Sequence, residues 1–423
     1  MESSDVSPTY KDGVLSITAI SPVNIALIKY WGKVEEKYII PLNNSLSITL
    51  STDDLCSTTC VSMSKAFKEN SLVLNGEDSK FTDRIKNMLD TIQAYIPQEG
   101  ITVKDEDGVQ HVIDKSDLVA MKLRIVSDNN FPTASGVASS SSGLSCLALC
   151  LAKIYGLDFD FSEISRLARL GSGSASRSLF GGFVEWERGF KDFKELDEDI
   201  KTVDKGSKAI QVCTQSHWPD ICCFIMVADS EKKKVSSTKG MKDSVDTSEF
   251  LKHRENVIVP RQLERIKKAL NEKDWPLLAE VTMQESNNLH AVCLDTYPPI
   301  FYMNSTTKSL ISMIHDLNST HSEPVAAYTV DAGANCFVVT KREYAKFILN
   351  TVVEASGIKS EDLNESAHNH LNDASVKEFT PDKKVASIID EYKGKINLNR
   401  IIATKVGEGV KFIKNESKLM AKL

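Results

Sequence analysis

The chain lacks the long apolar runs and the surplus of positive charge that two large classes of protein require. Nothing in it approaches the roughly 18 uninterrupted apolar residues of a membrane span. Its 423 residues carry a formal net charge of −7, whereas proteins that bind a phosphate backbone usually carry a basic footprint. The start, MESSDVSPTYKDG, has neither a basic nor an apolar leader region. The sequence predicts a cytoplasmic protein that binds neither nucleic acid nor membrane.

Paired cysteines, a P-loop and internal repeats are also missing. The nine cysteines include no CxxC pair, which disfavours a metal site or a disulfide framework. Cys146 and Cys150 are four residues apart in an apolar helical run, where buried thiols are expected. No GxxxxGK[ST] pattern is present, so the chain is not a P-loop NTPase.

What the chain does have is the composition of an ordinary globular protein, with 41% hydrophobic and 26% charged residues, and enough length for two domains. Its periodicity changes repeatedly between that of strands and that of helices, which predicts an α+β fold. The pattern restarts after about residue 210, so we expect domains at 1–210 and 211–423. The expected strands cover 14–28, 45–51, 121–129 and 221–230, the expected helices include 81–96 and 161–170, and 104–117 and 171–178 are expected to be a loop and a turn.

A loop rich in small residues, from Pro132 to Ser142, precedes an apolar helix that ends near Gly156. Exposed N–H groups at a helix start form an anion cradle that the helix dipole assists, and serine hydroxyls add donors or a magnesium ligand. A helix N-cap rich in serine has the same pattern. The loop alone therefore does not decide between these interpretations.

Two further segments agree with an anionic ligand. Residues 171–178, GSGSASRS, contain Arg177, whose planar guanidinium suits bidentate binding of a carboxylate or phosphate. Asp331 lies between an apolar strand and an Ala-Gly turn, where a catalytic acid can approach a ligand closely. A solvated loop and an ordinary turn are the alternatives at these two positions.

The segment IKYWGK, residues 28–33, places two lysines beside an apolar stretch and completes a set of motifs. Together the motifs resemble the mevalonate diphosphate decarboxylase family of the GHMP kinase superfamily, from about residue 15 to residue 340. The serine loop is shared by the superfamily, whereas KYWGK beside GSGSASRS and DAGAN resembles the decarboxylase branch. The motifs are PVNIALIKYWGK, NNFPTASGVASSSSG, ARLGSGSASRSLFGGFVEW, VSSTKGM, SNNLHAVCLDTYPPIFYMN and AYTVDAGAN.

The resemblance implies a two-domain GHMP kinase fold, with an N-terminal domain like domain 2 of ribosomal protein S5, an α/β C-terminal domain and an active site in the interdomain cleft. It also implies ATP-dependent decarboxylation of mevalonate 5-diphosphate to isopentenyl diphosphate, in the mevalonate pathway of isoprenoid and sterol biosynthesis. ATP would be the co-substrate, Mg²⁺ the cofactor and a homodimer the assembly.

The resemblance carries three catalytic residues over to this chain: Asp331 beside the 3-hydroxyl, Arg177 at the departing carboxylate or the 3-oxygen, and Lys29 near Asp331. Solvated charges at the rim are the alternative for Lys29 and Lys33. The implied substrate contacts are Asn24, Tyr30, Trp31, Gly32, Lys33, Arg84, Ser172, Gly173, Ser174, Ala175, Ser176, Arg177 and Thr238, with Tyr30 and Lys33 facing the diphosphate. The implied ATP contacts are Ser135, Gly136, Ala138, Ser139 and Ser140, and Ser139 is also a candidate magnesium contact.

Some positions depart from the family pattern or stay outside the assigned chemistry. Val137, Ser141, Ser176 and Ala334 stand where leucine, alanine, cysteine and proline are frequent in the family, and none of these changes removes a charged group. Asn287 and His290 are expected to form a buried, satisfied polar pair without a catalytic role.

Two other functions stay open at this point. A GHMP kinase that does not decarboxylate its product would keep the same loops, and release of CO₂ with ADP distinguishes it. A ligand sensor without catalysis would not turn ATP over. Separately, Ala421-Lys422-Leu423 follows the small-basic-leucine pattern of the peroxisomal address Ser-Lys-Leu, so the peroxisome is the alternative to the cytoplasm.

Overall fold

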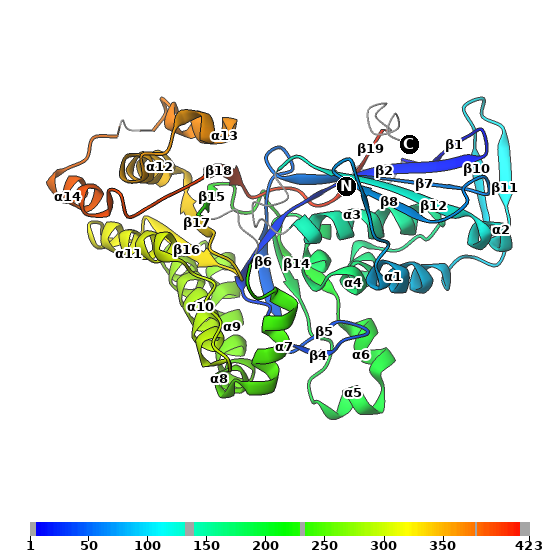
Figure 1. The fold of residues 1–423 in the computed structure, drawn as a ribbon, viewed down its shortest axis with the longest axis horizontal. Coiled ribbons are helices and arrows are strands. Elements are labelled where there is room, and N and C mark those ends of the chain that lie inside the picture. The colour runs from blue at the N-terminus through cyan, green and yellow to red at the C-terminus, as the bar shows by residue number, and fades with distance from the viewer. Residues whose placement is uncertain (1–5, 132–138, 229–232, 377–378, 415–423) are drawn as a thin grey trace.

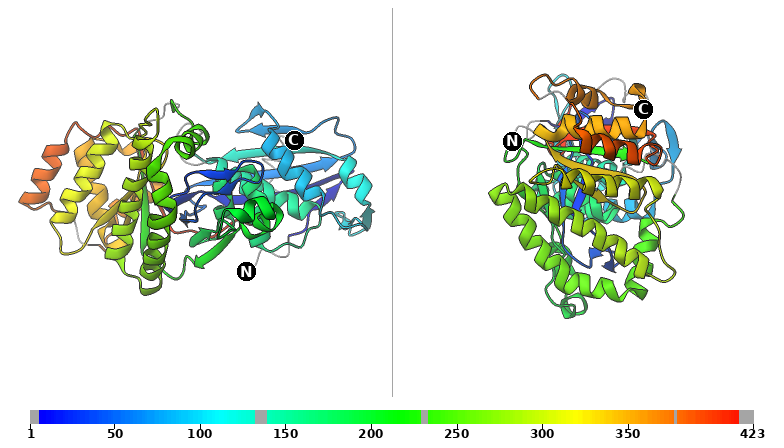
Figure 2. Two further views of the ribbon diagram at one scale, coloured as in Figure 1. Left: turned by 90° about the horizontal axis from the view of Figure 1, so that it is seen from below. Right: turned by 90° about the vertical axis from the view of Figure 1, so that its left-hand side faces the viewer.

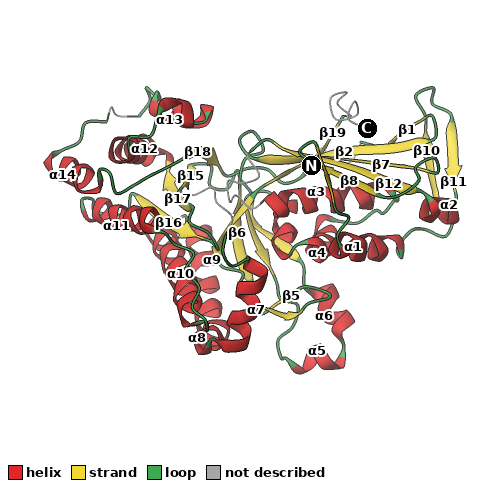
Figure 3. Ribbon diagram, in the orientation of Figure 1, coloured by secondary structure: helices red, strands yellow, loops and turns green. Residues whose placement is uncertain are grey.

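The structure is a computed structural model that describes residues 6–131, 139–228, 233–376 and 379–414. Three main sheets and their helices form an elongated molecule (Figure 2). Both strands and helices are present in each half of the chain (Figure 3), so the predicted α+β class is confirmed. None of the described helices is long and apolar enough to cross a bilayer.

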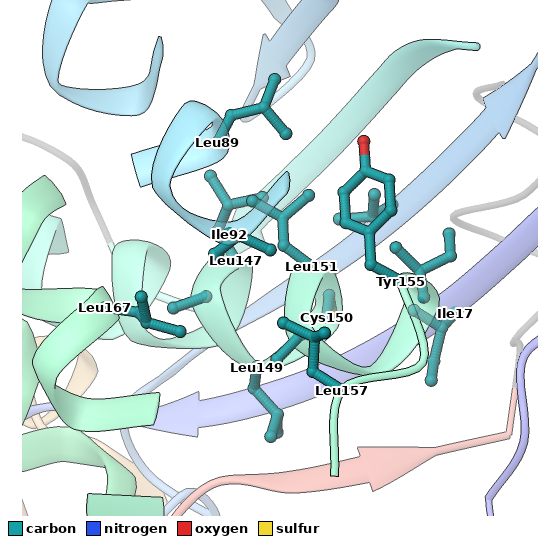
Figure 4. Close-up of a cluster of buried hydrophobic side chains, with 14 of the residues drawn as sticks. Ile17, Leu89, Ile92, Leu147, Leu149, Cys150, Leu151, Tyr155, Leu157 and Leu167 are labelled. Carbon is teal, nitrogen blue, oxygen red and sulfur yellow. The ribbon is translucent and has the colours of Figure 1, made fainter. Parts of the chain in front are cut away.

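The first sheet is antiparallel except where β8 runs parallel to β12. Helices α1, α3 and α4 cover one of its faces, and their apolar side chains interleave with those of the strands (Figure 4). Because strand side chains alternate between faces, Leu15, Ile17 and Ala19 all reach this core. In spatial order the strands are β1 (Thr9–Lys11), β2 (Val14–Pro22), β7 (Cys56–Ser64), β12 (Lys122–Asn129), β8 (Ser71–Leu74) and β9 (Glu77–Ser79), and β19 (Lys411–Ile413) pairs with β2. The helices are α1 (Asp83–Gln93), α3 (Ser139–Ile154) and α4 (Phe161–Gly171).

The second sheet lies in the middle of the molecule, where the two halves of the chain meet (Figure 1). Its strands share a core with helices α9 and α10 and with one face of the third sheet. In spatial order the strands are β14 (Ala209–Cys213), β13 (Phe183–Trp186), β6 (Ser45–Thr49) and β3 (Asn24–Ile28). The helices are α9 (Val259–Glu272) and α10 (Trp275–Asp295).

The third sheet is apolar on both faces, as the sequence of β15 requires. Cys223 and Ile225 of β15 face the core around α9 and α10, while Phe224 and Met226 face α11, α12 and α14. A strand buried on both faces therefore has apolar residues throughout. The sheet order is β16 (Ala326–Val330), β17 (Cys336–Lys341), β15 (Ile221–Val227) and β18 (Arg400–Lys405), and the covering helices are α11 (Ser305–Ser319), α12 (Arg342–Ser356) and α14 (Lys383–Tyr392).

The remaining elements connect or flank these layers. The helical ones are α2 (Lys115–Ala120), the 3₁₀ helix η2 (Gly173–Leu179), α5 (Lys194–Glu198), α6 (Ile200–Gly206), α7 (Ser237–Thr247), α8 (Glu249–His253), the π-helical η3 (Arg254–Ile258), η4 (Ser360–Asp362) and α13 (Glu365–Leu371). The short strand pairs are β4 (Lys33–Glu35) with β5 (Ile40–Pro41), and β10 (Ile101–Lys104) with β11 (Gln110–Ile113).

Three local predictions are wrong. The strand predicted over 14–28 is two strands, because the chain leaves the first sheet at Val23 and continues in the second. The acidic segment 104–117 is not a plain loop, since it contains strand β11 and the start of α2. The turn predicted over 171–178 is mostly the 3₁₀ helix η2, whose buried side chains secure it.

The C-terminal segment returns to the first sheet, where Lys411, Phe412 and Ile413 of β19 pair with β2. The division into domains at residue 210 remains a prediction.

The nine cysteines form no disulfide, and Cys146 and Cys150 are buried in the first core, as predicted.

Candidate active site

A buried lysine and a half-exposed aspartate form the centre of the candidate site. Lys29 directly follows β3 and Asp331 directly follows β16, so two strand ends bring these residues together. Lys29 Nζ pairs with Asp331 Oδ1, and the two side chains are 1% and 42% exposed. The ammonium is therefore held inside the protein, while the carboxylate remains accessible to a ligand.

The surroundings of Lys29 act on its proton affinity in opposite directions. Burial lowers the pKa of the Lys29 ammonium, the charges of Asp331 and Glu285 raise it again, and that of Arg177 lowers it further. The predicted closeness of Lys29 to Asp331 is confirmed. Because the Lys29 and Lys33 side chains are 1% and 4% exposed, the alternative of solvated rim charges is wrong for both.

Arg177 lies in η2 with its guanidinium buried beside this pair. Its Nη1 donates to Ser45 Oγ at 2.7 Å, and its guanidinium carbon is 5.8 Å from the ring centre of Trp186. Burial lowers the pKa of Arg177 to about 10, against the charge of Asp331, so the side chain stays cationic at neutral pH. Its Nε has no partner among the described residues, which leaves a buried donor available to an anion.

Tyr30 and Trp186 form an aromatic wall next to Arg177. The Tyr30 ring lies 4.7 Å from that of Trp186, and its buried hydroxyl has no partner within the described part of the chain. Burial raises the pKa of Tyr30, so this hydroxyl is a neutral donor. Trp31 Nε1 donates to Ser244 Oγ at 3.0 Å, which fixes the indole against α7.

Lys33 begins β4, and its Nζ lies 2.5 Å from Glu36 Oε2. Its ammonium is therefore paired with a carboxylate of the protein. A groove of about 700 Å³ opens beside Lys33, and Tyr38 and Leu251 are among the residues that line it. Gly32 precedes Lys33 at φ +96°, a conformation that L side chains rarely adopt.

Asn24 ties strand β3 to η2. Its Nδ2 donates to the Ser174 carbonyl at 3.0 Å and to Ser178 Oγ at 2.8 Å. Its Oδ1 is buried without a partner among the described residues. The oxygens of Ser172 and Ser174 are 3.3 Å apart on the half-buried side of this segment, where hydroxyls remain accessible.

Two residues predicted as substrate contacts have side chains that face the interior. Ala175 belongs to the first hydrophobic core, and Ser176 Oγ donates to the Gly173 carbonyl at 2.7 Å. Both side chains are 0% exposed. Their side chains therefore hold η2 in place instead of reaching a ligand.

Arg84 and Thr238, both predicted as substrate contacts, are exposed. Arg84 is in the first turn of α1, and its charge lowers the pKa of Tyr30 against the larger effect of burial. Thr238 is in the first turn of α7. The charge of Arg84 therefore acts on a residue of the site. Thr238 remains a predicted substrate contact.

Most of the predicted ATP loop is outside the described residues. Ser135, Gly136 and Ala138 fall there, as does the side chain of Ser139, which begins α3. Ser140 is exposed in the first turn of α3. The predicted ATP contacts and the magnesium contact at Ser139 therefore remain predictions.

Asn287 and His290 do not form the predicted polar pair. Asn287 is exposed and accepts a hydrogen bond from the Tyr328 hydroxyl at 3.0 Å. His290 Nε2 is 3.3 Å from the Val330 carbonyl. Burial, together with the charge of Lys29, lowers the pKa of His290 to about 4, so this ring is neutral near pH 7.

The motifs assigned no role to several residues that build the site. Ser45 holds Arg177, and Trp186 supports both Arg177 and Tyr30. Lys233 Cε would lie 3.6 Å from a Cβ at Gly333, two residues after Asp331. A serine or a tryptophan within a strand has no spacing that marks a functional role. The lysine run 232–234, by contrast, is a cluster of positive charge that can be recognised in the sequence.

Gly173 is required by close packing against the aromatic wall. A Cβ at this position would lie 2.7 Å from Trp186 Cη2 and 3.0 Å from Tyr30 Cε1. We expect Gly173→Ala to lower the free energy of unfolding by about 1–3 kcal/mol, as overpacking does, and to raise KM for the substrate. Thermal unfolding and steady-state kinetics measure both effects.

Gly143→Ala is the matched control, because the nearest atoms would lie 3.9 Å from its Cβ. Unchanged stability and unchanged KM in Gly173→Ala would show that Trp186 and Tyr30 move freely and are not a fixed wall.

Two family models match the chain. The model for the diphosphomevalonate decarboxylase-like N-terminal domain matches residues 21–198, and that for the mevalonate 5-diphosphate decarboxylase C-terminal domain matches 223–413. Lys29 and Arg177 lie in the first region, and Asp331 lies in the second. The site is therefore assembled from both regions.

Individual relatives resemble the chain over almost its whole length. The diphosphomevalonate decarboxylase of Schizosaccharomyces pombe is 36% identical over 409 residues, 96% of each chain. The structure of the mevalonate diphosphate decarboxylase from Trypanosoma brucei superposes with a TM-score of 0.79 at 32% identity, over 94% of this chain and 98% of that one. A structure described as MDDEF in complex with MVAPP, AMPPCP and magnesium gives 0.70 at 26% identity, over 95% and 100%. The chain belongs to the diphosphomevalonate decarboxylase family.

Proposed function

We propose that the protein catalyses the ATP-dependent decarboxylation of mevalonate 5-diphosphate to isopentenyl diphosphate, with release of ADP, phosphate and CO₂. The observation that carries the proposal is the Lys29–Asp331 pair beside the buried guanidinium of Arg177. A carboxylate that a ligand can reach, next to a cation with an open donor, suits a substrate with a hydroxyl and a carboxylate on one carbon skeleton.

The first step is phosphorylation of the 3-hydroxyl. This oxygen attacks the γ-phosphorus of ATP, the bond from that phosphorus to ADP breaks, and Asp331 accepts the hydroxyl proton. A tertiary alcohol is a crowded nucleophile, so positioning supplies much of the catalysis. Lys29 keeps the Asp331 carboxylate in one orientation.

The second step breaks two bonds of the phosphorylated intermediate. The C3–oxygen bond breaks as phosphate leaves, the bond to the carboxylate breaks as CO₂ leaves, and the electron pair of that bond forms the new C=C bond. Asp331 first passes the proton that it accepted to an oxygen of the departing phosphate. Its carboxylate then stabilises the positive character that develops at C3, in a site that must exclude water. Arg177 orients the carboxylate until it leaves.

ATP and Mg²⁺ fit the residues present. Mg²⁺ prefers oxygen ligands, keeps several waters and is usually bound through one or two carboxylates plus substrate phosphates. Within the described ranges, no group of three or more His, Cys, Asp or Glu side chains is arranged to hold a metal. The predicted ATP loop leads into α3, so the exposed Ser140 would be a described residue to approach a magnesium ion bound to ATP. When bound, the ion neutralises the phosphate charge.

Removal of magnesium is expected to abolish turnover, since the ion neutralises the charge of the ATP phosphates as the phosphoryl group is transferred. The test assays the purified protein with ATP after dialysis against a chelator, and then after titration of MgCl₂. Activity should disappear and return with the ion. Full activity in excess chelator would contradict this assignment.

Product analysis tests the proposed function itself. Mass spectrometry of a reaction with mevalonate 5-diphosphate and ATP should identify isopentenyl diphosphate. An accumulating 3-phosphorylated product would support the kinase alternative, and absence of ATP turnover would support the sensor alternative.

We further propose a cytoplasmic homodimer, on the basis of the family resemblance. Light scattering after size exclusion should give about twice the chain mass of 46.8 kDa. The peroxisomal alternative concerns Ala421-Lys422-Leu423, which lie outside the described residues. A fluorescent reporter carrying this tripeptide should stay diffuse, whereas a punctate signal that is lost on its deletion would establish import.

A further inference from the structure

A buried ion pair formed by residues distant from Lys29 in the sequence makes direct contact with the backbone of Lys29. Arg254 begins η3 and Glu285 lies in the middle of α10, and both side chains are 0% exposed. Arg254 Nη1 donates to Glu285 Oε1 at 3.1 Å and Nη2 donates to Oε2 at 2.8 Å. This bidentate geometry gives each partner one fixed orientation.

Both members of the pair also bind the same residue of the active site. The Lys29 N–H donates to Glu285 Oε2 at 3.2 Å, and Arg254 Nη2 donates to the Lys29 carbonyl at 3.0 Å. Asn43 Nδ2 donates to the same carbonyl at 3.1 Å. Hydrogen bonds therefore hold both the N–H and the carbonyl of Lys29. An ion pair that served only to connect η3 with α10 would not need these bonds.

Helix α10 holds the other strand end in the same way. The Val330 N–H, one residue before Asp331, donates to Ser286 Oγ at 3.0 Å. Ser286 is the neighbour of Glu285, so two consecutive side chains of one helix bind the ends of β3 and β16. The helix thereby sets the position of Lys29 relative to Asp331.

We propose that Arg254 and Glu285 are positioning residues of the reaction, which fix the Lys29 backbone so that its ammonium meets Asp331. The inference rests on the proposed function. Arg254 lies at the start of a π-helical turn, an irregularity often found at functional sites. Here the turn places a guanidinium against the end of a strand from the other half of the chain.

The test compares three variants by thermal unfolding, steady-state kinetics and hydrogen exchange. Glu285→Gln keeps the side-chain length but loses the charge and one acceptor oxygen. The double variant Arg254→Met/Glu285→Leu replaces the pair with apolar side chains, a change that often preserves stability. Glu280→Gln is the control, because Glu280 lies on the same helix and pairs with Arg265 at a half-exposed position.

We expect kcat to fall about 100-fold in Glu285→Gln and in the double variant, the loss typical of a displacement of about 1 Å in an active site. KM for ATP should stay close to that of the wild type, because the predicted ATP loop lies in another part of the chain. Exchange of the peptide that contains the Lys29 amide should accelerate, and Glu280→Gln should behave as wild type. A stability loss without a fall in kcat would identify a merely structural pair.

Wild-type kcat in a folded double variant would overturn the proposal. If that variant does not fold, Glu285→Gln decides alone: faster exchange at Lys29 with unchanged kcat overturns the proposal too. Failure of the proposed function is a separate result, because the wild-type protein would then release no CO₂ from mevalonate 5-diphosphate.

Discussion

Replacing Asp331 with asparagine is expected to reduce kcat by about 10²–10⁴-fold, the usual contribution of a general base. The amide has nearly the shape of the carboxylate but cannot accept the hydroxyl proton. It also leaves the buried Lys29 ammonium without its partner. Since burial lowers the pKa of Lys29 and Asp331 opposes that shift, loss of the carboxylate should lower this pKa further.

ATP binding should survive in Asp331→Asn, because the predicted ATP loop comes from another part of the chain. Isothermal titration with a non-hydrolysable ATP analogue and the kinetic assay separate the two effects. Asp390→Asn, at an exposed position of α14, is the matched control. Activity like that of the wild type in Asp331→Asn would remove this residue from the mechanism.

Arg177→Lys is expected to lower kcat/KM for mevalonate 5-diphosphate by about 10²–10³-fold, the cost of losing a preorganised donor in an active site. An ammonium keeps the charge but not the planar set of donors. It would also lose the contact with Trp186 and the hydrogen bond to Ser45 in their present geometry. The free Nε has no counterpart in lysine.

Arg188→Lys provides the comparison, because Arg188 also lies over an aromatic ring, that of Phe190 at 4.4 Å, and donates to backbone carbonyls. Steady-state kinetics and thermal unfolding of both variants should separate catalysis from packing. Equal kinetic losses in the two variants, or none in Arg177→Lys, would mean that Arg177 is structural.

The motifs singled out Lys29, Arg177 and Asp331 because these are charged residues in short segments made otherwise of small or apolar residues. Lys29 and Asp331 were placed together by resemblance, and the structure pairs them. The periodicity also predicted the α+β class. It could not predict that the chain changes sheet at Val23, because both halves of 14–28 are apolar and only the strand partners differ.

Long-range partners of the site could not be predicted in the same way. Arg254 and Glu285 lie in helical segments rich in charged and polar residues, where solvated side chains are the ordinary expectation. Only the tertiary structure brings them within hydrogen-bonding distance of Lys29. Ala175 and Ser176 show the converse, since they lie inside a motif but face the core.

Coupled measurement of ADP and CO₂ released from mevalonate 5-diphosphate tests the central claim most directly. The assay uses substrate labelled in the carboxyl carbon, follows ADP and labelled CO₂ in the same reaction, and includes Asp331→Asn as the inactive control. The proposed mechanism predicts that one CO₂ forms for each ADP, and that neither forms without the other. ADP release without CO₂ would contradict the account and identify a kinase.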